Sequence, residues 1–302
     1  MERDPLAQLE AGPIFLVGHM RSGTTWVFDV LTAHPQVAGL FESIIFASVG
    51  PLVADRHWDA ERHQEIFGRD AGLGQFLDRD EVLRDVRDLV DRWLARALAP
   101  EHRFIVEKAP AGANAVATVA KLYPDALIIH IARDGRDVAI STAAARGSWA
   151  RADYKGEPEP PSSRALWAIG LGWAGQVSQL RQQALTLSLP HHEVRYEEMH
   201  AKPRETARQL FDFCGIPTDD ALLDEILAQT HFSKHTKTGQ HSFRRKGQAG
   251  GWRQEWGRWE KLLFSAAAGE VLEQMGYAPP TPKRAEQLRK ALMRVEKLKG
   301  FI

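Results

Sequence analysis

The chain has 302 residues, and its 39 lysines and arginines balance its 39 aspartates and glutamates, so its formal net charge at pH 7 is zero. A balanced chain of this kind is a poor candidate for a nucleic-acid binder or a binder of anionic membranes. Hydrophobic residues make up 44% and charged residues 26%, which argues against disorder as the main state. The single cysteine, Cys214, excludes an intramolecular disulfide and a cysteine-rich zinc site, and a reducing cytoplasmic location fits it best.

The sequence contains no recognisable secretion or membrane segment. Residues 1–12, MERDPLAQLEAG, mix charges and lack the apolar stretch of a secretory signal, so we interpret them as an N-terminal extension. No run approaches the roughly 18 apolar residues of a membrane-spanning helix. We expect a single domain over residues 1–302 that ends in a basic helix within residues 281–302.

Apolar runs bounded by glycine, proline or polar residues predict the secondary structure in chain order. We expect strands at residues 13–18, 36–41, 104–107, 126–132 and 192–196. We expect two C-terminal helices, preceded by helices at residues 26–33, 80–98, 113–122, 136–145, 165–187, 203–214 and 219–230. Loops are expected at residues 50–74, with short helices, and at residues 151–163 and 231–251. Because strands alternate with helices, the sequence predicts a three-layer α/β fold around a central parallel sheet.

The strongest functional signal is the segment GHMRSGTT at residues 18–25, between the first strand and the first helix. Backbone N–H groups at such a turn, together with the positive end of the helix dipole, form a cradle for an anion. The two glycines have the spacing of the triphosphate-binding P-loop, but Thr24 stands where that loop carries lysine. Arg21 can contact a terminal anionic group instead. By itself the segment is equally compatible with an ordinary tight turn.

Two further segments are candidate anion sites. ARDGRDVAIS, residues 132–141, ends the strand at residues 126–132 and enters a helix, so that Arg133 and Ser141 can clamp a phosphate. FRRKGQAGGW, residues 243–252, combines three consecutive cations with glycines, the composition of a flexible anion clamp. Taken singly, these segments are also compatible with a solvated helix start and a solvated basic turn. Together the three segments indicate a nucleotide with well-separated phosphates and no metal.

The three segments, in this order, resemble the sulfotransferases that use 3′-phosphoadenosine 5′-phosphosulfate (PAPS). RSGTTW resembles the family's 5′-phosphosulfate loop, ARDGRDVAIS its 3′-phosphate site, and FRRKGQAGGW its C-terminal clamp. The resemblance covers most of the chain, from Phe15 to Trp252, and implies the P-loop-like sulfotransferase fold. It also implies metal-independent, in-line transfer of a sulfuryl group from PAPS as co-substrate, with 3′,5′-adenosine bisphosphate (PAP) as product.

The resemblance implies roles for individual residues. The residues that would hold the 5′-phosphosulfate are Arg21, Ser22, Gly23, Thr24 and Thr25. Those that would hold and cover the 3′-phosphate are Arg133, Ser141, Arg245, Lys246 and Gly247. Those that would lie near the adenine are Trp26, Tyr196, Thr230 and Phe232.

The segment that would supply the catalytic base differs from that of the family's cytosolic branch, in which the base is a histidine in a Lys-Thr-His segment. Residues 106–110 of this chain read VEKAP, which resembles the bacterial, carbohydrate and tyrosyl-protein branches, where a glutamate after the first helix is the base. Glu42 fits by its position, and we expect its apolar neighbours to bury it in part and favour it as proton acceptor. A solvated loop glutamate is the alternative. Lys108 would stabilise the sulfuryl group and Arg21 the leaving phosphate, although Lys108 is also compatible with a surface lysine or one paired with Glu107.

Other functions stay open on the sequence alone. A P-loop kinase-like phosphotransferase is the second enzyme class, and the missing loop lysine counts against it. A catalytically silent nucleotide-binding scaffold is a third class. Nine tryptophans suggest a small-molecule, lipid or carbohydrate acceptor without choosing among them. The amphipathic C-terminal helix is expected to pack on the domain, with a homodimer as an alternative, and no cysteine or acidic cluster completes a metal site around His231 and His235.

Overall fold

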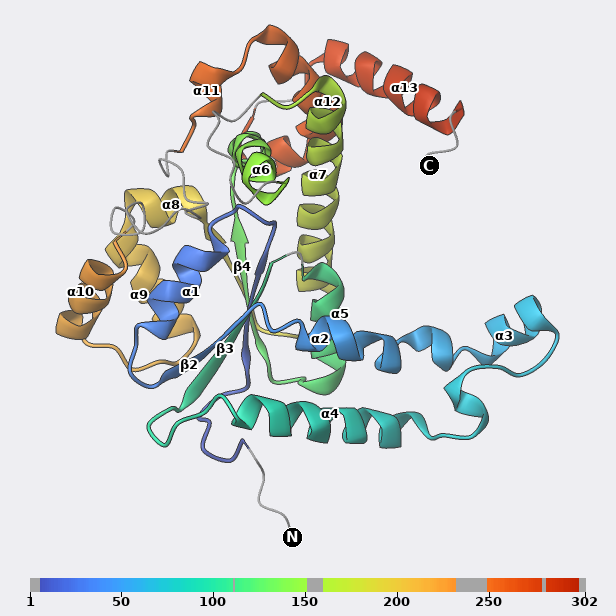
Figure 1. The fold of residues 1–302 in the computed structure, drawn as a ribbon, viewed down its shortest axis with the longest axis vertical. Helices are drawn as coiled ribbons and strands as arrows, with labels where there is room; N and C mark the ends of the chain where they lie inside the picture. Colours follow the sequence, from blue (N-terminus) through green and yellow to red (C-terminus); the bar gives the residue numbers. More distant parts are fainter. Residues whose placement is uncertain (1–5, 111, 151–159, 232–248, 279–280, 299–302) are drawn as a thin grey trace.

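The computed structural model describes residues 6–110, 112–150, 160–231, 249–278 and 281–298. They form a five-stranded sheet in the order β2-β3-β1-β4-β5, in which every neighbouring pair of strands is parallel (Figure 1). The strands are β1 (Ile14–Gly18), β2 (Val37–Phe41), β3 (Phe104–Pro110), β4 (Leu127–Ala132) and β5 (His191–Arg195). The predicted central parallel sheet is therefore confirmed.

Helices connect the strands and cover both faces of the sheet. The longer ones are α1 (Thr24–Thr32), α3 (Ala60–Phe67), α4 (Arg79–Ala95), α5 (Ala113–Leu122), α6 (Gly135–Ala150), α7 (Ser163–Thr186), α9 (Pro203–Phe213), α10 (Asp220–Gln229), α12 (Arg258–Gln274) and α13 (Lys283–Leu298). The shorter ones are α2 (Ile45–Val49), α8 (Tyr196–Ala201), α11 (Trp252–Glu255) and the 3-10 helices η1 (Gly50–Val53), η2 (Asp55–His57) and η3 (Leu73–Gln75).

Side chains of the strands alternate between two apolar clusters, one on each face of the sheet. Ile14 and Leu16 of β1 pack with α1, α8, α9 and α10, whereas Phe15 and Val17 pack with α2, α4, α5 and α7 (Figure 1). Cys214 at the end of α9 belongs to the first cluster, and its burial raises the pKa of its thiol to about 12. Because both faces are covered, the strands consist of nearly continuous apolar runs, which made them recognisable in the sequence.

A third apolar cluster joins the C-terminal helices to the sheet. It lies between α6, α7, α12 and α13 and includes Ala132 at the end of β4. The basic helix α13 contributes Ala285, Leu288 and Leu292 to it, so this helix packs on the domain through its apolar face.

The differences from the predicted elements concentrate near the ends of strands. β3 continues to Pro110, three residues past its predicted end, because Lys108, Ala109 and Pro110 remain in register with the last residues of β1. The helix α8 begins at Tyr196, which the sequence placed at the end of a strand. By contrast, the short helices α3, η1 and η2 agree with the prediction of a loop with short helices at residues 50–74. In Figure 1, α3 and the outer end of α4 project away from the sheet as an arm.

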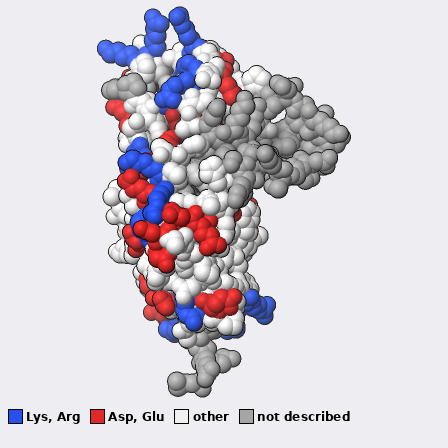
Figure 2. Space-filling model, turned by 90° about the vertical axis from the view of Figure 1, so that its left-hand side faces the viewer, with Lys and Arg blue, Asp and Glu red and all other residues white. Residues whose placement is uncertain are grey.

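None of the helices in the described ranges combines the length and the apolar composition needed to cross a bilayer. Figure 2 shows the side of the molecule formed by α8, α9 and α10, where acidic and basic side chains are interspersed. Ion pairs between α9 and α10 join Arg204 to Asp224 at 3.0 Å and Arg208 to Asp220 at 2.8 Å. The cytoplasmic location, the homodimer and the boundaries of the N-terminal extension stay predictions.

Candidate nucleotide and acceptor site

The connection between β1 and α1 forms a tight loop at the carboxyl end of the central strand. Arg21 and Gly23 adopt left-handed backbone conformations, with φ values of 69° and 100°. Gly23 is required for a second reason, because a Cβ atom there would lie 2.6 Å from Cδ2 of Tyr196. No side chain caps α1, and the first N–H groups of a helix have no partners within it. The loop therefore has the backbone features of an anion cradle.

The two predicted phosphate segments meet at Arg21. Its Nε donates a hydrogen bond to Ser141 Oγ at 3.0 Å, and Nη1 of Arg133 donates to the backbone oxygen of Arg21 at 3.2 Å. Ser141 lies in α6 and Arg133 in the turn before it, 120 and 112 residues further along the chain. Two guanidinium groups at one loop concentrate positive charge at this edge of the sheet.

Ser22 adds a hydrogen-bonding group to the loop. The residue is completely buried, and its hydroxyl has no hydrogen-bond partner among the described residues. An unsatisfied buried hydroxyl costs free energy, so Ser22 is suited to a bound anion that would satisfy it. Burial lowers the pKa of the neighbouring His19, which keeps its ring neutral at pH 7 and leaves the positive charge to the arginines.

Trp26, Tyr196 and Thr230, which the resemblance relates to the adenine, lie together beside the loop. The rings of Trp26 and Tyr196 meet edge to face, with centroids 5.9 Å apart, and Trp26 Nε1 donates to the backbone oxygen of Thr230 at 3.2 Å. The guanidinium of Arg133 lies 4.1 Å from the centroid of the Tyr196 ring. All three predicted residues are buried, so they also serve the core.

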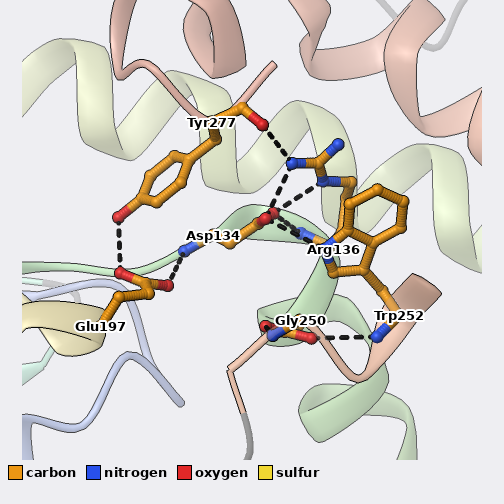
Figure 3. Close-up of polar contacts among 7 residues, drawn as sticks. Asp134, Arg136, Glu197, Gly250, Trp252 and Tyr277 are labelled. Atoms are coloured by element: carbon orange, nitrogen blue, oxygen red, sulfur yellow. Dashed lines mark hydrogen bonds and ion pairs between the residues drawn. The ribbon is translucent and has the colours of Figure 1, made fainter. Parts of the chain in front are cut away.

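A polar network that the sequence analysis did not single out fixes the turn between β4 and α6 (Figure 3). The Asp134 carboxylate accepts hydrogen bonds from Arg136 Nε and Nη2, each at 2.8 Å, and from Trp252 Nε1 at 3.0 Å. The backbone N–H of Asp134 donates to Glu197 Oε1 at 3.0 Å, and the Tyr277 hydroxyl donates to Glu197 Oε2 at 3.0 Å. This network holds the backbone on which the second phosphate segment is built.

Asp137 in the first turn of α6 binds the C-terminal end of the predicted clamp segment, residues 243–252. Its carboxylate accepts hydrogen bonds from the N–H of Gly250 at 2.6 Å and the N–H of Trp252 at 3.1 Å (Figure 3). These two residues therefore lie against the helix that carries Ser141. The other predicted residues of this region lie outside the described residues: Phe232, Arg245, Lys246 and Gly247.

Lys108 and Glu42 form an ion pair on the other side of the loop, with Nζ and Oε1 2.7 Å apart. The Lys108 side chain is only 2% exposed, and its ammonium also lies 3.8 Å from the centroid of the Phe41 ring. A surface lysine is thus excluded, and Glu42 rather than Glu107 is its partner. The Glu42 side chain is 47% exposed, so the predicted burial of this carboxyl is wrong. The ion pair, not an apolar pocket, defines its surroundings.

A cavity of about 650 Å³ borders Glu42 on the face of the sheet covered by α2 and α5. Its lining is largely apolar, and its ionisable residues are Glu42, Asp55, Arg56, Glu107 and Lys121. This volume is typical of small-molecule sites. No group of three or more His, Cys, Asp or Glu side chains in the described part of the chain could hold a metal ion.

Strained backbone conformations occur both in the β1–α1 loop and beside the cavity. Within the described ranges, the non-glycine residues with positive φ are Arg21, Glu42 and Ile44, at 69°, 51° and 55°. Such conformations cost roughly 1–3 kcal/mol each and concentrate at functional sites. Arg21 belongs to the anion loop, and the other two border the cavity.

The fold and the loop define an α/β protein with a P-loop-like fold, in which Thr24 stands at the position of the P-loop lysine and Arg21 lies within the loop. The sequence model described as the sulfotransferase family matches residues 13–220, more than half of the chain, and the chain belongs to this family.

Individual relatives agree with this assignment. The chain is 25% identical over 260 residues to an uncharacterized protein of Aquifex aeolicus (strain VF5), covering 83% of this chain and 31% of that protein. It is 24% identical over 210 residues to protein-tyrosine sulfotransferase 1 of Danio rerio, covering 70% of this chain and 55% of that protein. The chain thus spans about a third to a half of the length of these curated relatives.

A solved structure confirms the fold. Mouse sulfotransferase SULT7A1 complexed with PAP superposes with a TM-score of 0.57 at 18% identity, covering 90% of this chain and 89% of that one.

Proposed function

We propose that this protein transfers a sulfuryl group from PAPS to a hydroxyl or amine group of a small-molecule, lipid or carbohydrate acceptor. The observation that carries this proposal is the contact of Arg21 with both Ser141 and Arg133, since it joins two anion-binding segments more than a hundred residues apart. A nucleotide with phosphates at both ends of an adenosine needs two such groups close together. Membership of the sulfotransferase family supports the same function.

The nucleotide side fits PAPS in charge and in hydrogen-bonding capacity. The loop N–H groups, the unsatisfied Ser22 hydroxyl and Arg21 suit the 5′-phosphosulfate, with Gly23, Thr24 and Thr25 forming the start of α1. Two groups, Arg133 and Ser141, suit the 3′-phosphate.

The adenine is proposed to lie on the Arg133 side of the loop. The residues near it would be Trp26, Tyr196, Thr230 and Phe232. The residues that would cover the 3′-phosphate are Arg245, Lys246 and Gly247, a proposal that rests on the resemblance alone. The mouse sulfotransferase was crystallised in complex with PAP, which supports PAP as the product here.

Chemistry at the site follows from three charged side chains. PAPS supplies an activated sulfuryl group with a phosphate oxygen as leaving group. Glu42 accepts the proton of the acceptor hydroxyl while that oxygen bonds to sulfur and the bond from sulfur to the phosphate oxygen breaks. Lys108, 2.7 Å from Glu42, orients this carboxylate and offers its ammonium to the sulfuryl oxygens. Arg21 offsets the negative charge that develops on the leaving phosphate.

The cavity beside Glu42 is the proposed acceptor site. Its volume of about 650 Å³ and its largely apolar lining suit a compact acceptor with an apolar body. The Danio rerio relative is named a protein-tyrosine sulfotransferase, which supports including phenols among the acceptors tested.

A transfer assay with radiolabelled PAPS tests the proposal. The purified protein is incubated with labelled PAPS and panels of alcohols, phenols, sugars and amines. We expect label in an acceptor and formation of PAP in equal amount. Absence of transfer together with absence of stabilisation by PAP in a thermal-shift assay would contradict the proposal. Stabilisation by ATP with magnesium in place of PAP would favour the kinase-like alternative.

A further inference from the structure

Glu107 is a buried carboxyl that the proposed transfer step does not use. It precedes Lys108 in β3, and successive residues of a strand point to opposite faces of the sheet. Lys108 therefore faces Phe41 and Glu42, whereas Glu107 faces the layer of α2 and α5 and is only 3% exposed. A charged residue in this position needs an explanation, because burying a carboxyl group is costly.

The two oxygens of Glu107 have different surroundings. Oε1 accepts a hydrogen bond from the Ser43 hydroxyl. Oε2 is buried and has no hydrogen-bond partner among the described residues. Glu107 also lines the cavity that borders Glu42. The cavity wall thus contains a hydrogen-bond acceptor that the described part of the protein leaves unsatisfied.

The other acidic group of the lining is already satisfied by ion pairs. Asp55 lies 2.8 Å from Lys121 and 2.6 Å from Arg79, so its charge is offset within the protein. Glu42 is also paired, with Lys108, but it is the proposed base, and Glu107 is the carboxyl group of the lining that has a buried oxygen without a partner among the described residues. The two groups that can receive hydrogen bonds from an acceptor therefore belong to adjacent strands.

The register of β2 and β3 brings these two groups close together. Leu40 pairs with Glu107 and Phe41 with Lys108, and the N–H of Glu42 donates to the backbone oxygen of Lys108 at 3.0 Å. Ser43, next to Glu42 in the chain, donates a hydrogen bond to Oε1 of Glu107. Glu42 and Glu107 line the same cavity from neighbouring parts of the fold, so one small molecule there can present a polar group to each of them.

We propose that Glu107 binds a second donor group of the acceptor, so that the protein selects acceptors with two neighbouring hydroxyl or amine groups, one sulfated at Glu42 and the other held by Oε2 of Glu107. This inference rests on the proposed sulfuryl transfer and names its acceptor class: vicinal diols, catechols and amino alcohols with an apolar body. Burial raises the pKa of Glu107 to about 7, so at pH 8 most of this group is a carboxylate that accepts hydrogen bonds.

Binding of matched pairs of compounds to the PAP-loaded protein at pH 8 tests this selection. The pairs are catechol with its monomethyl ether, and a vicinal cyclohexanediol with its monomethyl ether. Wild-type protein is expected to bind the compound with two hydroxyls about tenfold or more tightly, because the ether leaves Glu107 unpaired. Glu107→Gln presents an amide donor to the cavity and should reduce the preference to less than about twofold, with unchanged affinity for PAP.

Two further variants separate recognition from structural damage. Glu205→Gln removes an exposed carboxylate of α9 that does not line the cavity and should keep the full preference. Ser43→Ala frees Oε1 of Glu107 and should weaken the preference several-fold even if Glu107→Gln fails to fold.

The outcomes distinguish this inference from the proposed function. Equal binding of both members of each pair, no detectable binding of any compound, or a preference that survives in Glu107→Gln would overturn the role of Glu107 while PAP still binds. Failure of the wild-type protein to bind PAP would refute the sulfuryl transfer itself, and the inference with it.

Discussion

The anion loop and the cavity beside β3 border the same edge of the sheet, but they are built in different ways. The loop is made mostly of consecutive residues between β1 and α1, and Arg133 and Ser141 complete it from one further strand-to-helix turn. The cavity is assembled from α2, η1, η2, the end of β3 and α5, with two to four residues contributed by each. The proposed nucleotide site thus depends on local backbone geometry, whereas the proposed acceptor pocket depends on side chains from distant parts of the sequence.

This contrast has an energetic side. In the loop, the residues with left-handed backbone conformations are Arg21 and Gly23. The hydrogen-bond network around Asp134 stabilises the adjoining turn. In the cavity, the costly elements are the buried Glu107 and the left-handed Glu42 and Ile44. Hydrogen bonds within the protein preorganise the turn beside the loop, and both regions keep a buried group without a partner among the described residues, the Ser22 hydroxyl in the loop and Oε2 of Glu107 beside the cavity.

The largest expected effect separates chemistry from nucleotide binding. Glu42→Gln should lower the kcat of sulfuryl transfer by about 100-fold or more, because the amide cannot take the acceptor proton. The Kd for PAP, measured by calorimetry, should stay unchanged. The exposed Glu205, which pairs with Lys202 at the surface, provides the matched control Glu205→Gln, expected to have wild-type turnover. Wild-type kcat in Glu42→Gln would remove this residue from its role.

A second effect tests the nucleotide side alone. Arg133→Ala should weaken PAP binding by roughly 10- to 100-fold, since a charge-assisted hydrogen bond is lost. Binding of adenosine 5′-phosphosulfate, which lacks the 3′-phosphate, should change much less. Arg133→Lys keeps the charge and should lie between wild type and Arg133→Ala. If both nucleotides weaken equally in Arg133→Ala, Arg133 supports the loop and does not contact the 3′-phosphate.

A third effect measures how tightly the loop is constrained. Gly23→Ala should destabilise the protein by about 1–3 kcal/mol and weaken PAP binding, because φ is 100° and the new methyl group would meet the Tyr196 ring. Gly175→Ala is the control, since a Cβ atom there meets nothing within 4 Å and α7 should gain up to about 1 kcal/mol. Urea unfolding of the three proteins checks both values. A loop that tolerates Gly23→Ala as easily as α7 tolerates Gly175→Ala would not be a constrained anion cradle.

The smallest effect is a pH dependence of stability on the acceptor side. Burial raises the pKa of Glu107 from 4.5 to about 7, so the folded protein holds this proton more tightly than the unfolded chain. The stabilisation is complete below about pH 4.5 and is lost as the pH rises through 7. The Gln side chain of Glu107→Gln does not titrate. The melting temperature of this variant minus that of the wild type should therefore increase by a few degrees between pH 5 and pH 8. A constant difference across this range would contradict the raised pKa.

The fold was predictable because buried parallel strands leave a simple signal. Residues 13–18 and 126–132 are apolar runs followed by glycine or charged turns, and both form strands within one residue of the expected bounds. The short helix α8 was missed, since Tyr196 continues the apolar pattern of the preceding strand in the sequence but begins a helix in the structure. For residues 50–74 the sequence predicts a loop with short helices, and α3, η1 and η2 form there, but the few regularly spaced apolar residues do not define the bounds of these helices.

The sequence predicted the parts of the candidate site that depend on backbone geometry. It did not predict the parts that depend on which side chains become partners. The meeting of Arg21 with Arg133 and Ser141 followed from motifs at the ends of neighbouring strands. The exposure of Glu42 depends on its pairing with Lys108, which no local pattern encodes. One signal for Glu107 was present: two adjacent charges inside the apolar run FIVEKAP must point to opposite faces of the sheet, so one of them had to face the cavity.

A crystal structure of the protein with PAP tests the central claim most directly. We expect one PAP molecule to span the loop, with its 5′-phosphate on the N–H groups of α1 and Arg21, and its 3′-phosphate on Arg133 and Ser141. A PAP molecule that reaches only one of these two groups, or that binds away from the β1–α1 loop, would contradict the claim that they hold opposite ends of one nucleotide.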